Sequence, residues 1–158
     1  MAMLERLLEF LNQSQVGYTH HVHPTAFTAR EVASMEHLPA HEFAKTVVFH
    51  GDNGFGMAVL PADSKLDLQE LRVLLGLNRL RLATEGELAT VFPECELGAM
   101  PPFGNLHNLP VFVDAHLTGE EAIGFNAGTH RDVILLKFQD YERLVKPSIV
   151  RLARGAAA

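Results

Sequence analysis

Two apolar runs joined by a glycine-bounded turn constrain the fold of this chain more than any other feature of its sequence. Residues 46–50 and 55–60 are rich in the β-branched and aromatic side chains that favour strands. The four residues between them, Gly51-Asp-Asn-Gly54, can supply the positive φ angles that a tight turn needs. We therefore expect an antiparallel hairpin in this part of the chain.

Three further segments carry the signature of a helix start. Thr28, Asp67 and Thr84 each stand three residues before a glutamate, so a capping oxygen can accept a hydrogen bond from an amide of the first turn. Phe27 and Val32 are spaced to form a hydrophobic staple at the first of these starts. The pattern predicts helices over residues 28–36, 67–75 and 84–91.

The remaining apolar patterns predict an intermixed set of helices and strands. Leucines at helical spacing indicate an opening helix over residues 3–13, and a similar pattern indicates a last helix over 138–145 that Pro147 ends. Strands are expected over residues 18–23, 111–113, 122–125 and 133–136. Because strands and helices do not alternate regularly, we expect an α+β domain with a mixed or antiparallel sheet, not a doubly wound parallel sheet.

The length and composition fit one compact domain. A chain of 158 residues with 47% hydrophobic residues can bury a sizeable core, and it leaves no room for a second catalytic domain. We expect the domain to cover residues 1–150 and residues 151–158 to form a frayed tail. The sequence shows no secretory signal pattern and no apolar run long enough to span a membrane.

The charge and the cysteine content narrow the range of partners. A formal net charge of -6 opposes the extended phosphate contacts that a long duplex requires, so DNA is not an expected partner. Any nucleic acid must contact a local patch. Cys95 is the single cysteine, which excludes an internal disulfide or a cysteine-rich zinc site and suits the reducing cytoplasm.

Nine histidines raise the question of a metal site, most of all His20, His21 and His23. On a strand, His21 and His23 would share one face while His20 takes the other. His37 and His41 are four residues apart, but a proline between them opposes a continuous helix. We therefore interpret the histidines as surface or hydrogen-bonding groups and expect neither a metal nor another cofactor.

Familiar catalytic motifs do not occur in the sequence. It has no Gly-x-Ser-x-Gly elbow, no phosphate-binding Gly-x-x-x-x-Gly-Lys loop and no dinucleotide-binding glycine motif. Cys95 lies between Glu94 and Glu96, whose carboxylates should raise the pKa of its thiol and reduce its reactivity. We interpret Cys95 as a structural residue.

A lysine and two loops remain as candidates for chemistry. Lys45 directly precedes the predicted hairpin, where its ammonium can meet a carbonyl oxygen or a phosphate at reduced dielectric, or can simply be a snorkelling strand-end lysine. Residues 98–104 contain two prolines between glycines, so they form either a rigid crossover or a set of fixed amide donors for an oxyanion. Residues 125–132 offer polar contacts or form a plain turn.

Three blocks stand in a fixed order along the chain: Lys45-Thr46, Gly98-x-x-x-Pro102, and Asn126-x-Gly128 leading to Asp132. Together they resemble the YbaK and prolyl-tRNA synthetase associated domain family, and the likeness covers roughly residues 3–146. The family consists of free-standing or synthetase-inserted domains that hydrolyse the ester between a wrong amino acid and the 3′ end of tRNA. The resemblance implies a single α+β domain whose mixed or antiparallel sheet, or partial barrel, is surrounded by helices.

The resemblance also implies a metal-independent deacylase that acts in trans, on a small amino acid carried by proline tRNA. It makes Lys45 and Gly98 the catalytic residues: Lys45 would hold the terminal phosphate or polarise the ester, and the backbone around Gly98 would surround the aminoacyl group. The tRNA 2′-hydroxyl, or a water that it orients, would assist the reaction. The substrate-binding residues would be Thr46, Ala99, Met100, Pro101, Pro102, Asn126, Gly128, His130 and Asp132.

The expected partners are the acceptor end of aminoacyl-tRNA and prolyl-tRNA synthetase, in the cytoplasm and without a membrane. Two other classes of function stay open at this point. The same pocket would serve a non-catalytic binder of aminoacyl-tRNA or of a synthetase, and the histidines would serve a metal hydrolase. Alanine, cysteine and serine all fit as the mischarged amino acid, since a methylene in an apolar pocket changes discrimination by only about 1 to 3 kcal/mol.

Overall fold

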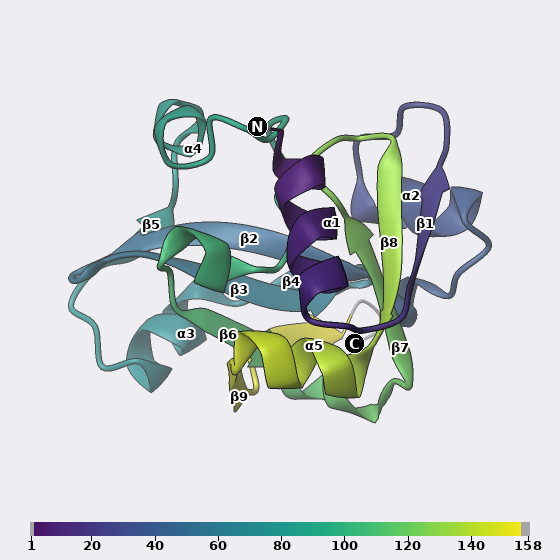
Figure 1. Cartoon of the computed structure of the whole chain (residues 1–158). Coiled ribbons are helices and arrows are strands. Elements are labelled where there is room, and N and C mark those ends of the chain that lie inside the picture. Colours follow the sequence, from purple (N-terminus) through teal and green to yellow (C-terminus); the bar gives the residue numbers. More distant parts are fainter. Residues whose placement is uncertain (1, 156–158) are drawn as a thin grey trace.

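Three sheets and their covering helices make up residues 2–155, the part of the chain that this computed structural model describes (Figure 1). The five-stranded sheet has the order β5 (Leu80–Leu82), β2 (Ala44–Gly51), β3 (Gly54–Pro61), β6 (Val111–Asp114) and β9 (Ser148–Val150). The three-stranded sheet has the order β1 (Tyr18–Val22), β8 (Asp132–Lys137) and β7 (Ala122–Asn126). A two-stranded sheet pairs β4 (Ser64–Leu66) with β10 (Ala153–Gly155).

The sheets confirm the α+β prediction with mixed pairing. β3 pairs with β6 and β6 with β9 in parallel, whereas the other strand pairs are antiparallel. The described strands form three separate sheets and do not close into one barrel. A single parallel bridge between Phe43 and Gly124 links the two larger sheets.

The expected hairpin is present and is longer than its apolar runs. β2 and β3 pair in antiparallel register from Ala44 opposite Pro61 to Gly51 opposite Gly54. Two residues therefore form the turn, and Gly54 takes a φ of 110°, which favours glycine.

The predicted helices also form, with the caps that their sequences indicated. They are α1 (Met3–Gln13), α2 (Ala29–Met35), α3 (Leu68–Leu74), α4 (Glu85–Val91) and α5 (Phe138–Val145). The side chains of Thr28, Asp67 and Thr84 each accept a hydrogen bond from the amide three residues later. Short 3-10 helices occupy Ala40–Glu42, Gly104–His107 and Ala115–Gly119. No helix in the described range is long and apolar enough to cross a membrane.

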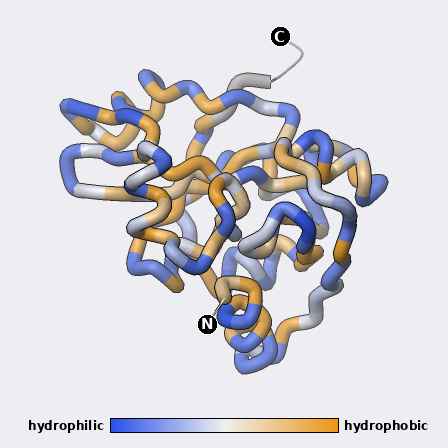
Figure 2. The backbone as a smooth tube through the Cα atoms, turned by 90° about the horizontal axis from the view of Figure 1, so that it is seen from above, coloured by the Kyte–Doolittle hydropathy of each residue, from blue (hydrophilic) through white to orange (hydrophobic). Residues whose placement is uncertain are grey.

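The main core lies between the two larger sheets and is covered by α1 and α5. Leu7 and Leu11 of α1 and Tyr141 of α5 are fully buried in this core. Seen from above in Figure 2, α1 alternates between hydrophobic and hydrophilic colours, in agreement with its single buried face. A second cluster packs α2 against the three-stranded sheet and the start of β2 through Val32, Phe43 and Val133.

The expected tail begins at residue 151, and its first residues contact the rest of the domain. Leu152 is buried, and its amide donates a hydrogen bond of 2.9 Å to Oδ1 of the buried Asp114. Residues Ala153–Gly155 then pair with β4. Residues 152–155 therefore have tertiary partners within the fold, whereas residues 156–158 of the expected tail lie outside the described residues.

Candidate functional site

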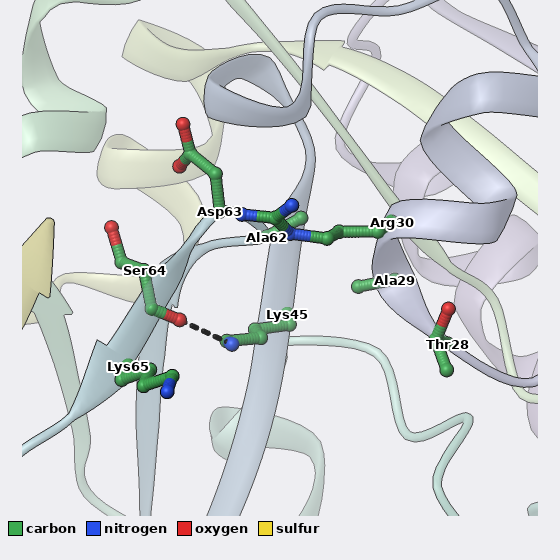
Figure 3. A pocket seen from close by; sticks show the side chains of 8 residues that line it. All are labelled: Thr28, Ala29, Arg30, Lys45, Ala62, Asp63, Ser64 and Lys65. Atoms are coloured by element: carbon green, nitrogen blue, oxygen red, sulfur yellow. Dashed lines mark hydrogen bonds between the residues drawn. The ribbon is translucent and has the colours of Figure 1, made fainter. Parts of the chain in front are cut away.

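Lys45 stands on β2 beside the short strand β4. Its Nζ donates a hydrogen bond to the main-chain carbonyl oxygen of Ser64, the first residue of β4 (Figure 3). An ammonium group has three N–H donors, so two remain for other acceptors. Lys45 is half-buried, and among the described residues it has no carboxylate partner within ion-pair distance.

A cavity of about 600 Å³ opens over Lys45. Its walls come from the start of α2, from β2, and from the turn that leads into β4. Figure 3 shows the residues that line it, which are Thr28, Ala29, Arg30, Lys45, Ala62, Asp63, Ser64 and Lys65. Three of these side chains are cationic and one is a carboxylate, so the cavity is positive in a chain whose formal net charge is -6.

Burial and neighbouring charges make Lys45 a weaker base than an ordinary lysine. Burial lowers its pKa below the usual 10.5, Arg30 and Lys65 lower the pKa further, and Asp63 opposes them. A lysine amine is ordinarily a cation at neutral pH. The cavity therefore offers a desolvated cation that can attract a developing negative charge.

The structure does not bring Thr46 to the same side of the sheet as Lys45. Successive side chains of a strand point to opposite faces. Ala44 and Val48, which flank Thr46 at spacing two, lie in the main core, and Val59 opposite Thr46 lies there too. Thr46 thus faces the core between the sheets, and only its backbone is near the lysine.

The Gly98 loop forms a second, closely packed region. Gly98 has a φ of 82°, a conformation that side chains rarely adopt, and the amide of Gly128 donates to the Ala99 carbonyl oxygen at 2.9 Å. The side chains of Ala99 and Met100 are buried, as are Pro101 and Pro102. The Tyr141 hydroxyl donates to the Pro102 carbonyl oxygen at 2.7 Å and fixes the far end of the loop.

Backbone hydrogen bonds tie this loop to the turn between β7 and β8. The amide of Glu96 donates to the Gly128 carbonyl oxygen at 2.9 Å, and Glu96 Oε1 accepts from the His130 amide at 2.9 Å. His130 Nε2 lies 2.5 Å from the Leu97 carbonyl oxygen, which fixes its proton on that nitrogen. The family blocks around Gly98 and Gly128 are therefore one connected unit.

The polar residues of the third block have different surroundings. Asp132 Oδ1 lies 2.7 Å from His20 Nε2, while Oδ2 accepts from the Thr129 hydroxyl at 2.6 Å, so this carboxylate is occupied by neighbours. Asn126 Oδ1 and His130 Nδ1 are buried and lack a hydrogen-bond partner within the described part of the chain. No protein donor in the described range uses these two acceptors.

The segment before α2 connects the two regions. The amide of Ala26 donates to the His130 carbonyl oxygen at 3.2 Å, and the rings of Phe27 and His130 have centroids 4.9 Å apart. Thr28, one residue on, lines the Lys45 cavity. The Gly98 loop and the third block do not line that cavity, so the predicted site residues fall into two neighbouring groups and not into one pocket.

Sequence reasoning missed several residues of the site. Arg30, Asp63 and Lys65 line the cavity, yet nothing in their sequence context distinguishes them from an ordinary helix start and turn. Phe27 was expected to staple α2, but its side chain is 70% exposed and lies against His130. The exposed Phe27 ring beside a positive cavity is the signal that points to these residues. It cannot be read from the sequence, because the exposure of Phe27 is known only once the chain is folded.

The histidines and Cys95, the other candidates for chemistry, have protein neighbours of their own. No group of three or more metal-ligating side chains occurs there, and His20 and His21 instead pair with Asp132 and Glu36. Burial, with a contribution from Glu94, raises the pKa of the Cys95 thiol to about 12. This agrees with a structural cysteine, although burial is a larger cause than the flanking carboxylates that the sequence suggested.

Comparison with known proteins decides the family. The family model described as an aminoacyl-tRNA editing domain matches residues 23–144, a range that includes Lys45, Gly98 and Asp132. The chain belongs to this family. The Lys45 cavity and the adjoining Gly98 unit, residues 96–102 with 126–132, are thus parts of an editing domain.

Relatives of this editing domain agree with the assignment over nearly its whole length. The multifunctional Ser/Thr-tRNA deacylase ProXp-y of Escherichia coli K12 is 29% identical over 157 residues, which are 96% of this chain and 93% of the relative. The prolyl-tRNA editing protein ProX of Acetoanaerobium sticklandii is 24% identical over 142 residues, 86% of each chain. A crystal structure of a candidate trans-editing enzyme for prolyl tRNA synthetase shares the fold, with a TM-score of 0.84, 24% identity and coverage of 98% of this chain and 99% of that chain.

Proposed function

We propose that this protein is a trans-editing deacylase, which hydrolyses the ester of mischarged aminoacyl-tRNA and releases a small amino acid, with proline tRNA as the carrier. Two relatives named for tRNA deacylation and prolyl-tRNA editing match 96% and 86% of its length. The single observation that carries the proposal is the Lys45 amine, a partly desolvated cation with free donors in a positive cavity.

Lys45 acts on the ester through charge. Water attacks the ester carbonyl carbon, and the carbonyl oxygen becomes an oxyanion that the remaining N–H donors of Lys45 stabilise. The tetrahedral intermediate collapses with cleavage of the bond to the ribose oxygen, which takes up the proton that the water loses. The neighbouring ribose hydroxyl relays this proton, so the protein needs no nucleophile of its own.

The Gly98 unit positions the aminoacyl group. Within the described residues, the amides of Gly98 and Met100 have no acceptor, so both can donate to the substrate. Asn126 Oδ1 and His130 Nδ1 are free acceptors for its amino group or for a side-chain hydroxyl. Gly128 and Asp132 hold the opposite wall in place by their backbone and side-chain hydrogen bonds, and Pro102 holds the end of the loop. The proposal thus has two catalytic residues, Lys45 through its amine and Gly98 through its backbone amide.

Single-turnover hydrolysis with a panel of mischarged tRNAs tests the proposal. We expect release of a small amino acid from at least one of alanyl-, cysteinyl-, seryl- and threonyl-tRNA, with proline tRNA among the carriers. Binding of these substrates without any accelerated hydrolysis would instead establish the non-catalytic binder. Activity that disappears on exhaustive chelation and returns with a metal would contradict the metal-independent mechanism.

A complex with prolyl-tRNA synthetase remains a prediction. Co-purification of the two full-length proteins, with and without mischarged tRNA, would test whether the partner is the synthetase or only the tRNA.

A further inference from the structure

The Lys45 cavity contains more positive charge than one ester requires. Arg30 and Lys65 line it in addition to Lys45, and Asp63 is the one carboxylate among the lining residues. Three other arginines pair with carboxylates, in Arg6–Glu94, Arg81–Glu87 and Arg143–Asp140. Arg30 and Lys65 have no such partner among the described residues.

The three cations lie at different depths. Lys45 is half-buried at the floor, where it donates to the Ser64 carbonyl oxygen, whereas the side chains of Arg30 and Lys65 are exposed. Figure 3 shows Arg30 reaching over the cavity from α2 and Lys65 standing on β4 at the other side, with the Lys45 amine between them. The cavity thus has a cationic rim on both walls and a single cation below it.

Both rim cations are held on ordered elements. Arg30 belongs to the first turn of α2, which Thr28 caps and which packs on Phe43 through Val32. Lys65 is the middle residue of β4, which pairs with β10. Their backbones are therefore fixed relative to Lys45, and only their side chains need to adjust to a ligand.

We propose that Arg30 and Lys65 form a phosphate-binding pair that holds the terminal phosphodiesters of the tRNA acceptor strand, which leaves Lys45 to the ester. A phosphodiester keeps its charge and most of its hydration at an exposed rim, where a guanidinium can bind two of its oxygens and an ammonium one. The ester is neutral until the reaction begins, so it can enter the desolvated floor at lower cost. This assignment rests on the proposed deacylase function and refines it by separating substrate binding from catalysis.

Kinetics of the full-length protein with its best mischarged tRNA test the assignment. Arg30→Gln and Lys65→Gln should each raise KM about three- to tenfold with little change in kcat, since exposed charge contacts contribute modestly. Lys45→Gln should lower kcat instead. Arg143→Gln and Lys137→Gln remove the same charges from exposed positions outside the cavity and should leave both constants unchanged.

The salt dependence of kcat/KM distinguishes phosphate binding from a purely structural role of Arg30 and Lys65. The logarithm of kcat/KM should fall with the logarithm of salt concentration, and each rim variant should reduce that slope by about 0.7, the value for one neutralised phosphate of a single strand. An unchanged slope and KM in the Arg30→Gln, Lys65→Gln double variant would overturn the assignment. A fall in kcat alone would overturn it as well.

A binding measurement keeps this inference separate from the deacylase proposal. The probe is the RNA trinucleotide CCA with alanine joined to its 3′ end by an amide, which cannot be hydrolysed as an ester. The double variant should bind it at least about tenfold more weakly than the parent, and trinucleotides with one or both phosphates replaced by neutral methylphosphonates should lose affinity for the parent only. If the parent binds the probe in this way but hydrolyses no ester, the deacylase proposal fails and the phosphate assignment stands.

Discussion

The Lys45 cavity and the Gly98 unit are joined by residues 26–30, and they differ in what surrounds their functional groups. The first gathers three cations around open space, and its key amine has one protein acceptor. The second is braced by mutual backbone hydrogen bonds between residues 96–99 and 128–130, with glycines at positive φ. One region therefore contributes charge and the other a fixed backbone geometry, so activity should respond differently to substitutions in each.

Removing the central charge should have the largest effect. We expect Lys45→Ala to lower the single-turnover rate of deacylation by about 100-fold or more, because it deletes the donor that meets the oxyanion. The circular dichroism spectrum and the urea midpoint should remain near those of the parent, since Lys45 is only half-buried. A variant that deacylates every substrate of the parent at the parent's rate would refute the role of charge in this cavity.

A substitution that distorts the backbone at Gly128 should disrupt the Gly98 unit and leave every charge in the protein unchanged. Gly128 has a φ of 97°, and an added Cβ would lie 2.9 Å from the Cβ of Met3. We expect Gly128→Ala to reduce the free energy of unfolding by about 1–3 kcal/mol in urea titrations and to lower activity as well.

Gly119→Ala is the matched control for this prediction. An added Cβ at Gly119 meets no atom within 4 Å, and this glycine has no positive φ. Its unfolding free energy should change by less than about 0.5 kcal/mol. Equal stability of the two alanine variants would show that the Gly128 turn does not depend on its backbone geometry.

The pH dependence of activity should report on the charge of Lys45. Because burial lowers the pKa of Lys45 below 10.5, the enzyme should lose its active cation at a lower pH than an ordinary lysine would. After subtraction of spontaneous ester hydrolysis, kcat/KM should fall with rising pH, with a midpoint below 10.5. Lys45→Arg, whose guanidinium stays charged, should flatten this alkaline decline.

Unfolding of the protein would not explain that decline. A lowered pKa in the folded state means that the unfolded chain binds the extra proton more tightly, so through Lys45 stability rises with pH across the window between the two pKa values. Urea midpoints measured over the same pH range therefore separate the two causes. A midpoint that falls in parallel with activity would contradict titration of Lys45 as the origin.

The smallest effect is expected at Cys95, which belongs to neither region's chemistry. Its thiol has a pKa raised to about 12 by burial, so almost no thiolate exists at neutral pH. Cys95→Ser should keep the parent's deacylation rate, and the native thiol should react with a disulfide reagent far more slowly than the urea-unfolded chain. Rapid modification accompanied by loss of activity would place Cys95 in the mechanism.

Most of the fold was predictable because its signals are local. Helix caps and tight turns depend on residues that are neighbours in the sequence. The three capped helices begin after Thr28, Asp67 and Thr84, and the hairpin turns before Gly54, as these local patterns predicted. The strands that the sequence did not predict are β4, β5, β9 and β10, each of three residues. Such short segments become strands through the partners that the fold brings to them, not through their own propensity.

The site was predictable only in its ordered blocks. Lys45 and residues 98–104 stood out as candidates, but only the resemblance gave Lys45 and Gly98 a role, because a lysine at the start of a strand can equally be a snorkelling side chain. The acceptor of Lys45 is a main-chain carbonyl of Ser64, which no residue pattern encodes. In the sequence, Arg30 is an ordinary residue of a helix's first turn. Only the packing of α2 in the folded protein places it in the lining of the cavity.

The two ends of the described chain support the two regions separately. Met3 at the start of α1 packs beneath Gly128, and β10 pairs with β4, whose first residue supplies the carbonyl that holds the Lys45 amine. During synthesis on the ribosome, the turn at Gly128 can settle against α1 as soon as it emerges. Strand β4, which supplies the carbonyl acceptor of Lys45, gains its partner β10 only after residue 155 has left the exit tunnel. We therefore expect a nascent chain to acquire deacylase activity only after this late step.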